Sequence, residues 1–253
     1  LGEQEKAIAY LEKALEMEKQ LNGPNHPNLA VRHNSLAAVL NASHKPDLAF
    51  DHYKRSFAIN DKTYGSDHPL VIQDLVNLGN TLTLSGEHVK AIAYFDRALA
   101  GMVNLLGENH ERVAALLNSI GYSLHSSGDH EKAITLYERA LTIDKKLYGE
   151  EHPNIPVRLN NIAKGFDPLG EHKKAIKAYE QALEIAKKTL GEKNLVVLIS
   201  LNGLGLEWYS LGKCKKAMKY FKEEKRIAET TGARGYGATD TEKAMETCGR
   251  KKK

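Results

Sequence analysis

The sequence predicts an all-α protein, built as a solenoid of antiparallel helix pairs, and three observations support this fold class. Apolar residues recur at helical spacing through most of the 253-residue chain. Aromatic residues make up only 7%, which argues against an aromatic-rich β core. A period of about 40 residues indicates an array in which each unit is one supersecondary motif. Here a turn with glycine recurs every 42 residues, at Gly23, Gly65, Gly107, Gly149 and Gly191.

Residues 154–191 show how one unit divides into two helices. Pro153 stands where a first helix begins, a position that tolerates proline. Apolar residues then follow helical spacing from Ile155 to Phe166. The stretch "LGEHKKA" interrupts the pattern, which then resumes until Gly191, and glycine commonly stands just past a helix end. Each unit is therefore expected to be two amphipathic helices joined by a short turn.

The array is predicted to cover residues 1–231. It begins with a half repeat, 1–27, whose single helix at 2–22 lacks a partner helix. The missing helix predicts that the chain starts inside a longer protein. Five helix pairs are predicted to follow, at 28–64, 70–106, 112–148, 154–190 and 196–231.

The end of the array is marked by a change in composition. Glu224 and Lys225 stand at positions that are apolar in the preceding repeats, and a terminal repeat is expected to show a polar outer face. Residues 232–253 are polar and glycine-rich, and are interpreted as a flexible tail with a short helix near 240–248. The basic run at 250–253 is interpreted as a solvated end.

Three departures from the repeat lie inside the array. Pro168 falls near the end of a first helix and is predicted to remove its last turn. Pro46 is acceptable because it begins a second helix. His44 stands where the other units have glycine, which predicts a less tight turn.

Seven of the eleven histidines follow the repeat, so they are interpreted as structural. Successive repeats stack about 10 Å apart, so one histidine per layer cannot converge on a metal ion or substrate. No metal site and no cofactor is predicted. One position, before the first helices, holds His26, His68, His110 and His152, and a second, before the second helices, holds His88, His130 and His172.

Charge and cysteine content limit the classes of partner and location. The net charge is only +4, with both signs interleaved, so neither a nucleic acid nor a membrane surface is expected as partner. The chain has two cysteines, Cys214 and Cys248, and no CxxC motif. A reducing compartment, and so a cytoplasmic location, is predicted. The sequence has no apolar run of about 18 residues that would indicate a membrane span.

Spacing within the unit identifies the repeat family. Small residues and an aromatic recur in a fixed order, shown by Gly121, Gly128, Ala133, Tyr137 and Ala140. This pattern resembles the tetratricopeptide repeat, in which small residues let paired helices approach closely. The usual unit has about 34 residues. The extra eight residues here, and stretches such as "LNNIA" and "ALEIAKKTLG", resemble the repeats of kinesin light chains and nephrocystin-3-like proteins.

The resemblance covers about residues 1–230 and implies a right-handed superhelical solenoid whose first helices line a concave groove. It also implies a peptide segment of a partner protein as ligand, acidic and with an aromatic or apolar anchor. Tyr122 and His125 are expected to receive the anchor, and Arg158 and Lys164 to pair with acids. The residues carried over to the groove are Asn34, Asn77, Asn80, Asn118, Tyr122, His125, Arg158, Asn160, Asn161, Lys164 and Asn202.

The asparagines on this face have two interpretations. An Asn amide both donates and accepts, so it could bond an extended peptide backbone without demanding its sequence. The same side chains could instead tie neighbouring helices together. Both interpretations remain open from the sequence.

The function predicted is a non-catalytic scaffold that binds a peptide in its groove. The sequence contains no GxGxxG, P-loop, HExxH or GxSxG motif, and its histidines, cysteines and acids follow the repeat rather than converging. The alternative is an assembly element, in which the array stacks on itself or on another domain of a larger protein. The oligomeric state is left open.

Overall fold

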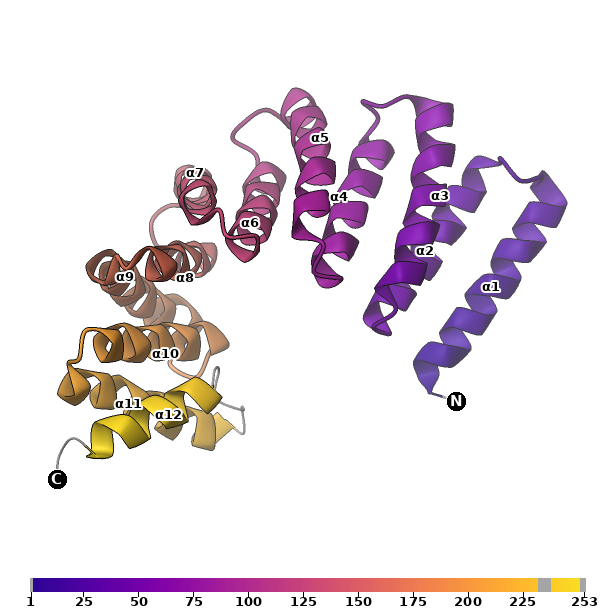
Figure 1. Cartoon of the computed structure of the whole chain (residues 1–253). Coiled ribbons are helices and arrows are strands. Elements are labelled where there is room, and N and C mark those ends of the chain that lie inside the picture. Colours follow the sequence, from indigo (N-terminus) through magenta and orange to yellow (C-terminus); the bar gives the residue numbers. More distant parts are fainter. Residues whose placement is uncertain (1, 232–237, 251–253) are drawn as a thin grey trace. The chain divides into compact units, whose positions relative to one another are not determined.

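The computed structural model describes residues 2–231 and 238–250, and every regular element in those ranges is a helix (Figure 1). The predicted all-α fold is confirmed. The elements are α1 Glu3–Asn22, α2 Pro27–Ala42, α3 Pro46–Tyr64, α4 Pro69–Leu84, α5 His88–Leu106, α6 Glu111–Ser126, α7 His130–Tyr148, α8 Asn154–Phe166, the 3-10 helix η1 Asp167–Leu169, α9 His172–Leu190, α10 Leu195–Ser210, α11 Cys214–Thr231 and α12 Ala238–Arg250.

The predicted helix pairs coincide with α2–α3, α4–α5, α6–α7, α8–α9 and α10–α11. Each predicted pair begins within one residue of the observed pair, and the second helix reaches the predicted end. We call α2, α4, α6, α8 and α10 the first helices, and α1, α3, α5, α7, α9 and α11 the second helices.

The chain forms two compact units, which are described separately. Unit 1 is Leu1–Ser127 and contains α1 to α6, and unit 2 is Gly128–Lys253 and contains α7 to α12. The boundary falls inside the third predicted pair, between α6 and α7. Within each unit, helices that follow one another in the sequence pack against each other.

The turns between repeats are helix-entry turns. Gly65 has φ +83°, a conformation that glycine adopts at little cost. The ring of His68 then accepts a hydrogen bond from the backbone N–H of Leu70 at 3.3 Å. Tyr64 stacks on that ring, with 4.4 Å between the ring centres. The same side-chain acceptor role is filled by His26, His110, His152 and Asn194. These residues turn the chain and begin the first helices, as the repeat predicts.

The turn within the first pair is as tight as the others, so the less tight turn predicted from His44 is wrong. His44 itself adopts a left-handed conformation, with φ +57°, where Gly86 has φ +78°. The backbone N–H of Lys45 donates to the carbonyl of Leu40 at 2.9 Å, and the equivalent bond from Glu87 is 2.8 Å. The chain therefore keeps the turn and accepts a conformation that is unfavourable for a side chain with a Cβ.

Paired helices approach closely where a glycine faces a phenylalanine. A Cβ built on Gly79 would lie 2.5 Å from the ring of Phe95, and one on Gly205 would lie 2.2 Å from the ring of Phe221. Both rings are fully buried. The absence of a side chain at these two positions lets the aromatic fill the space between the helices.

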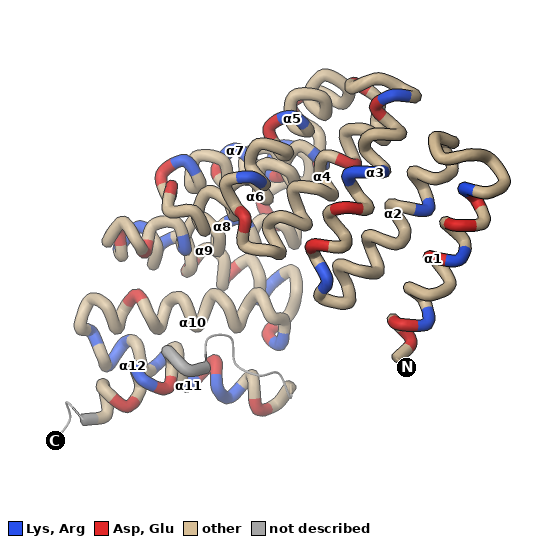
Figure 2. The backbone as a smooth tube through the Cα atoms, turned by 45° about the vertical axis from the view of Figure 1, so that its right-hand side comes forward, with Lys and Arg blue, Asp and Glu red and all other residues tan. Residues whose placement is uncertain are grey.

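α10 forms the central layer of unit 2. It packs against α9 and α11 and also contacts α8 and α12. Figure 2 shows it with almost no charged residues, in contrast to the neighbouring α11. Val197, Leu198, Leu201 and Leu204 are at most 1% exposed. An apolar helix of this kind has to be covered on more than one side.

Pro168 acts as predicted. α8 ends at Phe166, and residues 167–169 form the 3-10 helix η1 instead of a last α-helical turn. Proline lacks the N–H that an α-helix would use and clashes with the preceding turn. The consequence is that Asp167 lies at the start of η1 rather than inside α8.

Residues 238–250 correct the interpretation of the C-terminal segment as a flexible tail. They form α12, which contains the predicted short helix and contacts α10 and α11. Ala244 and Cys248 are 2% and 1% exposed, because they pack on the cluster around Phe221 and Trp208. Residues 232–237 and 251–253, which include most of the basic run, lie outside the described residues.

Cys214 and Cys248 form a disulfide that the sequence did not predict. It joins the first residue of α11 to α12, across 34 residues. Two cysteines far apart in a sequence carry no sign of pairing until the fold places their Cα atoms 5.2 Å apart. The pairing removes the basis on which a reducing compartment was predicted.

Candidate functional site

In unit 1 the first helices α2, α4 and α6 form one surface joined by side-chain hydrogen bonds. The Asn41 amide on α2 donates to the Thr81 hydroxyl on α4 at 2.8 Å. The hydroxyls of Thr83 on α4 and Ser123 on α6 lie 3.2 Å apart. We call this surface the first-helix face.

A hollow of about 470 Å³ lies on this face, and we call it the α2 hollow. Asn34, Ser35 and Ala38 of α2 contribute to its lining. Its rim is apolar, because Val31, Tyr64 and Leu70 are 58%, 44% and 46% exposed. Exposed apolar side chains of this size around a hollow are typical of a surface that another molecule covers.

Asn34 and Asn77 of the predicted groove take part in a network around a buried carboxylate. Asn34 donates to Asp74 at 2.7 Å and accepts from Asn77 at 3.1 Å. Asn60 and Ser56 of α3 also donate to Asp74, which is fully buried. Burial raises the pKa of Asp74, and these three donors oppose that rise. The two asparagines are half-buried and tie α2 to α4, so only part of each faces solvent.

The other predicted residues of unit 1 differ in exposure. Asn80 is exposed. Tyr122 is 51% exposed, and the edge of its ring meets the ring of His88 at 6.0 Å between centres. Asn118 and His125 are half-buried, and each interacts with another residue of the protein. Tyr122 and Asn80 are therefore the most accessible of the predicted contacts in this unit.

In unit 2 the equivalent positions are internal. Arg158 is 9% exposed and donates to the buried Asp144 of α7 at 2.9 Å. Asn160 is 3% exposed, accepts from the Ser200 hydroxyl at 2.9 Å and donates to the Val196 carbonyl at 3.4 Å. These side chains join α8 to α7 and α10, so they offer little surface to a peptide.

Asn202 has a similar place in α10. It is 4% exposed and donates to Glu224 of α11 at 3.2 Å and to Thr241 of α12 at 2.6 Å. Burial raises the pKa of Glu224, and the bond from Asn202 opposes that rise. Asn161 and Lys164 are half-buried and each interacts with another residue. For Asn160 and Asn202, the geometry favours the helix-tying interpretation.

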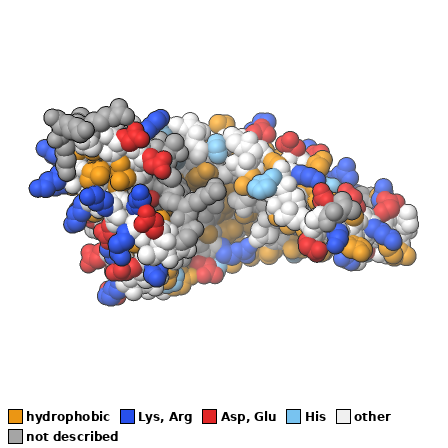
Figure 3. All heavy atoms as spheres, turned by 90° about the horizontal axis from the view of Figure 1, so that it is seen from below, with side chains coloured by type: hydrophobic (Ala, Val, Ile, Leu, Met, Phe, Trp, Pro, Cys, Tyr) orange, Lys and Arg blue, Asp and Glu red, His pale blue; other side chains and the backbone are white. Residues whose placement is uncertain are grey.

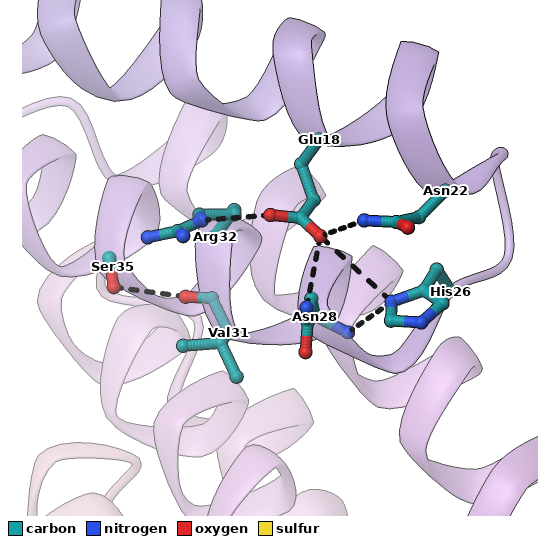
Figure 4. Close-up of polar contacts among 7 residues, drawn as sticks. All are labelled: Glu18, Asn22, His26, Asn28, Val31, Arg32 and Ser35. Atoms are coloured by element: carbon teal, nitrogen blue, oxygen red, sulfur yellow. Dashed lines mark hydrogen bonds and ion pairs between the residues drawn. The ribbon is translucent and has the colours of Figure 1, made fainter.

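The junction of α1 and α2 is tied by Glu18, which collects several polar groups (Figure 4). Its carboxylate accepts from the amides of Asn22 at 2.7 Å and Asn28 at 3.0 Å. Arg32 lies 3.6 Å and His26 3.9 Å from it. The Asn28 bond contributes most to lowering the pKa of Glu18. Arg32 is thus already paired within the protein.

His172 has a contact that its repeat position does not predict. Its Nδ1 lies 2.8 Å from Glu207 of α10 and 3.9 Å from Asp167 of η1. Burial raises the pKa of Glu207 to about 7, although the bond to His172 opposes the rise. A sequence signal was present, because the positions equivalent to Glu207 hold no acid: they are Val39, Thr81, Ser123 and Gly165.

The sequence matches the tetratricopeptide repeat family over almost its whole length. The matched segments are residues 1–62, 29–102, 72–146, 112–167 and 159–230. Together with the helix pairs, this shows that the chain belongs to the tetratricopeptide repeat family, a class of scaffold for protein interactions.

Solved structures share the fold at low sequence identity. BtubC (BKLC) from P. vanneervenii is 18% identical, with a TM-score of 0.76, and the match covers 92% of this chain and 94% of that one. The nearly identical TPR-like repeats of a suggested kinesin light chain from Podosopora anserina are 22% identical, with a TM-score of 0.70 and coverage of 81% and 98%. The apo quorum sensor NprR from B. thuringiensis is 17% identical, with a TM-score of 0.66 and coverage of 89% and 61%. These likenesses support the fold.

Among curated proteins, none matches the sequence. Of the helices in residues 2–231 and 238–250, none combines the length and apolar character needed to cross a membrane.

Proposed function

We propose that the chain binds a peptide segment of a partner protein along the first-helix face of unit 1. The observation that carries the proposal is the α2 hollow, with its exposed rim of Val31, Tyr64 and Leu70. An apolar or aromatic side chain of the peptide would fill the hollow. Its burial would supply about 1.5–3 kcal/mol, which is typical of one anchoring side chain.

Polar groups beside the hollow suit the backbone and acidic side chains of such a peptide. Asn34 and Ser35 line the hollow, and Asn80 is exposed elsewhere on α4. Arg112 stands on α6 at the position that Leu70 holds on α4, and its guanidinium donates to Gln73 at 2.5 Å. A carboxylate of the peptide could accept from the remaining guanidinium donors. Tyr122 would extend the surface along α6.

Unit 1 supports this role better than unit 2. The equivalent asparagines of unit 2, Asn160 and Asn202, are nearly buried and hold the helices together. A peptide could reach them only by displacing hydrogen bonds inside the protein. We therefore assign the peptide to α2, α4 and α6, and give Asn161 and Lys164 a lesser role.

The test is a binding screen with a library of peptides from disordered regions, run on two matched variants. Ala38→Arg would fill the α2 hollow, and Ala93→Arg would place the same exposed arginine on a helical alanine of the second-helix side. Peptides that bind the parent and Ala93→Arg but not Ala38→Arg would support the proposal. Equal binding by all three proteins, or no binding, would overturn it.

The second candidate function is an assembly element, and α1 favours it. Tyr10, Met17 and Leu21 of α1 are 75%, 53% and 78% exposed. Light scattering at increasing protein concentration tests this function. A parent that self-associates and a Tyr10→Glu/Leu21→Glu variant that stays monomeric would support assembly through α1.

A non-catalytic role belongs to the same proposal, whereas the cytoplasmic location stays a prediction from the sequence against which the disulfide stands. The location is tested directly by the disulfide between Cys214 and Cys248. Trapping free thiols at the moment of cell lysis would label both cysteines if the protein resides in a reducing compartment. Unlabelled cysteines would place it in an oxidising one.

A further inference from the structure

We propose that Asp167, His172 and Glu207 in unit 2 form a binding site for a divalent transition metal ion. A ligand atom of each lies within 4.8 Å of the other two. The Nδ1 atom of His172 is central, at 2.8 Å from Glu207 Oε2 and 3.9 Å from Asp167 Oδ1. This site is independent of the proposed peptide surface, which lies on unit 1.

Three separate elements bring the ligands together. Asp167 begins η1, which exists because Pro168 ends α8 early. His172 is the first residue of α9, four residues past Pro168. Glu207 reaches them from α10 of the following repeat. The site therefore depends on the stacking of the fourth repeat on the fifth.

The two acidic ligands, Asp167 and Glu207, are departures from the repeat, and they meet at His172, which follows it. The other repeats form the same helices and turns without acids at these positions. The fold therefore does not require Asp167 and Glu207. The equivalent positions, at multiples of 42 residues, hold Asn41, Thr83, His125 and Tyr209 for Asp167, and Val39, Thr81, Ser123 and Gly165 for Glu207.

The charge of the cluster favours a cation. Glu207 is 3% exposed, so its carboxylate is largely removed from water, and a second carboxylate lies beside it. A buried carboxylate either takes up a proton or is compensated by a positive charge. His172 can supply at most one such charge. A divalent ion would neutralise both carboxylates at once.

The ligand set also selects the type of ion. One imidazole nitrogen and two carboxylates suit Zn²⁺ and its first-row neighbours, whereas Ca²⁺ requires six to eight oxygen ligands. Zinc ligands lie about 2.0–2.2 Å from the ion, so their donor atoms are roughly 3–3.5 Å apart. The Asp167 side chain is 60% exposed and can close the longer separations by rotating.

Water can complete the coordination. A hollow of about 380 Å³ lies beside His172, and its lining also includes Gly170, Glu171, Lys173, Lys174 and Leu211. It provides an entry path and leaves room for one or two water ligands. The site is therefore an open three-ligand site, the arrangement found where zinc keeps an exchangeable position.

The experiment is titration of the metal-free full chain with ZnCl₂ by calorimetry, and with CoCl₂ by visible absorption. We expect one equivalent of Zn²⁺ to bind, and Co²⁺ to give the absorption bands of a low-symmetry N/O site. His172→Ala and Glu207→Gln are each expected to weaken binding at least tenfold, roughly as loss of one ligand does. His130→Ala, at the same repeat position one unit earlier, is the matched control and should bind like the parent.

Two results would overturn the proposal. One is a parent that binds Zn²⁺ no more tightly than His172→Ala. The other is a loss of binding in His130→Ala as large as in His172→Ala. Either would leave the cluster as a hydrogen-bonded tie between repeats. If the Glu207 variant does not fold, the exposed Asp167→Asn decides, since it should fold like the parent and still weaken Co²⁺ binding and change its spectrum.

Discussion

The two units use one repeated contact in opposite ways. In both units, a residue near the end of a second helix bonds to a residue on the next first helix, 14 positions later. In unit 1, Asn60 donates to Asp74 in a network of neutral donors around one acid. In unit 2, Asp144 and Arg158 fill the same two positions with a buried ion pair. Between them in the sequence, Met102 and Leu116 are both apolar and buried.

This difference shows that different pairs of side chains can link the same two helices without a change in the fold. Amides, an ion pair and an apolar pair all satisfy the same geometry. Unit 1 leaves its neighbouring first-helix face partly open, whereas unit 2 buries the equivalent face with α12 and internal hydrogen bonds.

Charge follows the same division. Residues 1–127 carry 11 Lys and Arg against 14 Asp and Glu, a net charge of −3, and residues 128–253 carry 25 against 18, a net charge of +7. The near-neutral total conceals this asymmetry. Figure 3 nevertheless shows acidic and basic side chains interspersed on the face in view. At long range an acidic partner would be attracted to unit 2 rather than to unit 1, and this attraction would weaken with salt. Binding of acidic peptide side chains to unit 1 would therefore depend on local contacts such as Arg112.

The largest expected effect comes from breaking the ion pair of unit 2. Arg158→Leu should lower the free energy of unfolding by about 3–5 kcal/mol, because it leaves the Asp144 carboxylate buried and unpaired. Trp208 is the only tryptophan and lies in unit 2, so its fluorescence during urea unfolding measures the loss.

The matched control copies the apolar pair of the third repeat. Asp144→Met/Arg158→Leu should recover most of that stability, because a buried ion pair contributes little beyond a well-packed apolar pair. A double variant as unstable as the single one would show that the pair has a role that packing cannot replace.

The next effect tests the disulfide that joins α12 to α11 in unit 2. Cys214→Ala/Cys248→Ala should lower the stability of unit 2 by about 3–4 kcal/mol, the loop entropy expected for a closed loop of 34 residues. Trp208 fluorescence should report the change, since Trp208 packs in the cluster that α12 covers. A dithiol reductant should have the same effect on the parent and none on the variant.

Acid should weaken unit 1 through the buried His33. Burial chiefly lowers the pKa of His33 to about 4, and the nearby His52 and Arg55 contribute. The unfolded state binds this proton below about pH 6.5, so stability is complete above that pH and falls between pH 6.5 and 4, by at most about 3 kcal/mol. Urea unfolding followed by circular dichroism across this range measures the slope.

His33→Leu is the matched variant, because leucine stands at this position in the other four repeats: Leu75, Leu117, Leu159 and Leu201. It should remove this contribution to the slope and raise stability at pH 5. An unchanged slope would mean that His33 is not the group that senses acid.

The smallest effect concerns the turn of the first pair. His44→Gly should stabilise unit 1 by about 1 kcal/mol, because glycine adopts the left-handed conformation without strain. Gly86→His in the next repeat should have the opposite sign and a similar size. Thermal unfolding of the two variants measures both, and effects of the same sign would contradict the strain argument.

The sequence by itself determined the repeat, the helix pairs and the turns. Each depends on residues close together in the chain, such as the glycine and histidine of an entry turn or Pro168 at the end of α8. The same local signals recur every 42 residues, so it is very unlikely that they arose by chance. The candidate peptide surface was predicted only as a list of positions on the first helices.

Tertiary structure decided what those positions do. Asn118 and Asn160 hold the same repeat position, but Asn118 is half-buried, whereas Asn160 is 3% exposed and bonded to Ser200, because contacts between repeats determine which amides face solvent. The disulfide likewise joins residues 34 positions apart, and Glu207 lies 35 positions from His172 and 40 from Asp167. Local propensity carries no information about such pairs, since only the stacking of one repeat on the next brings them within bonding distance.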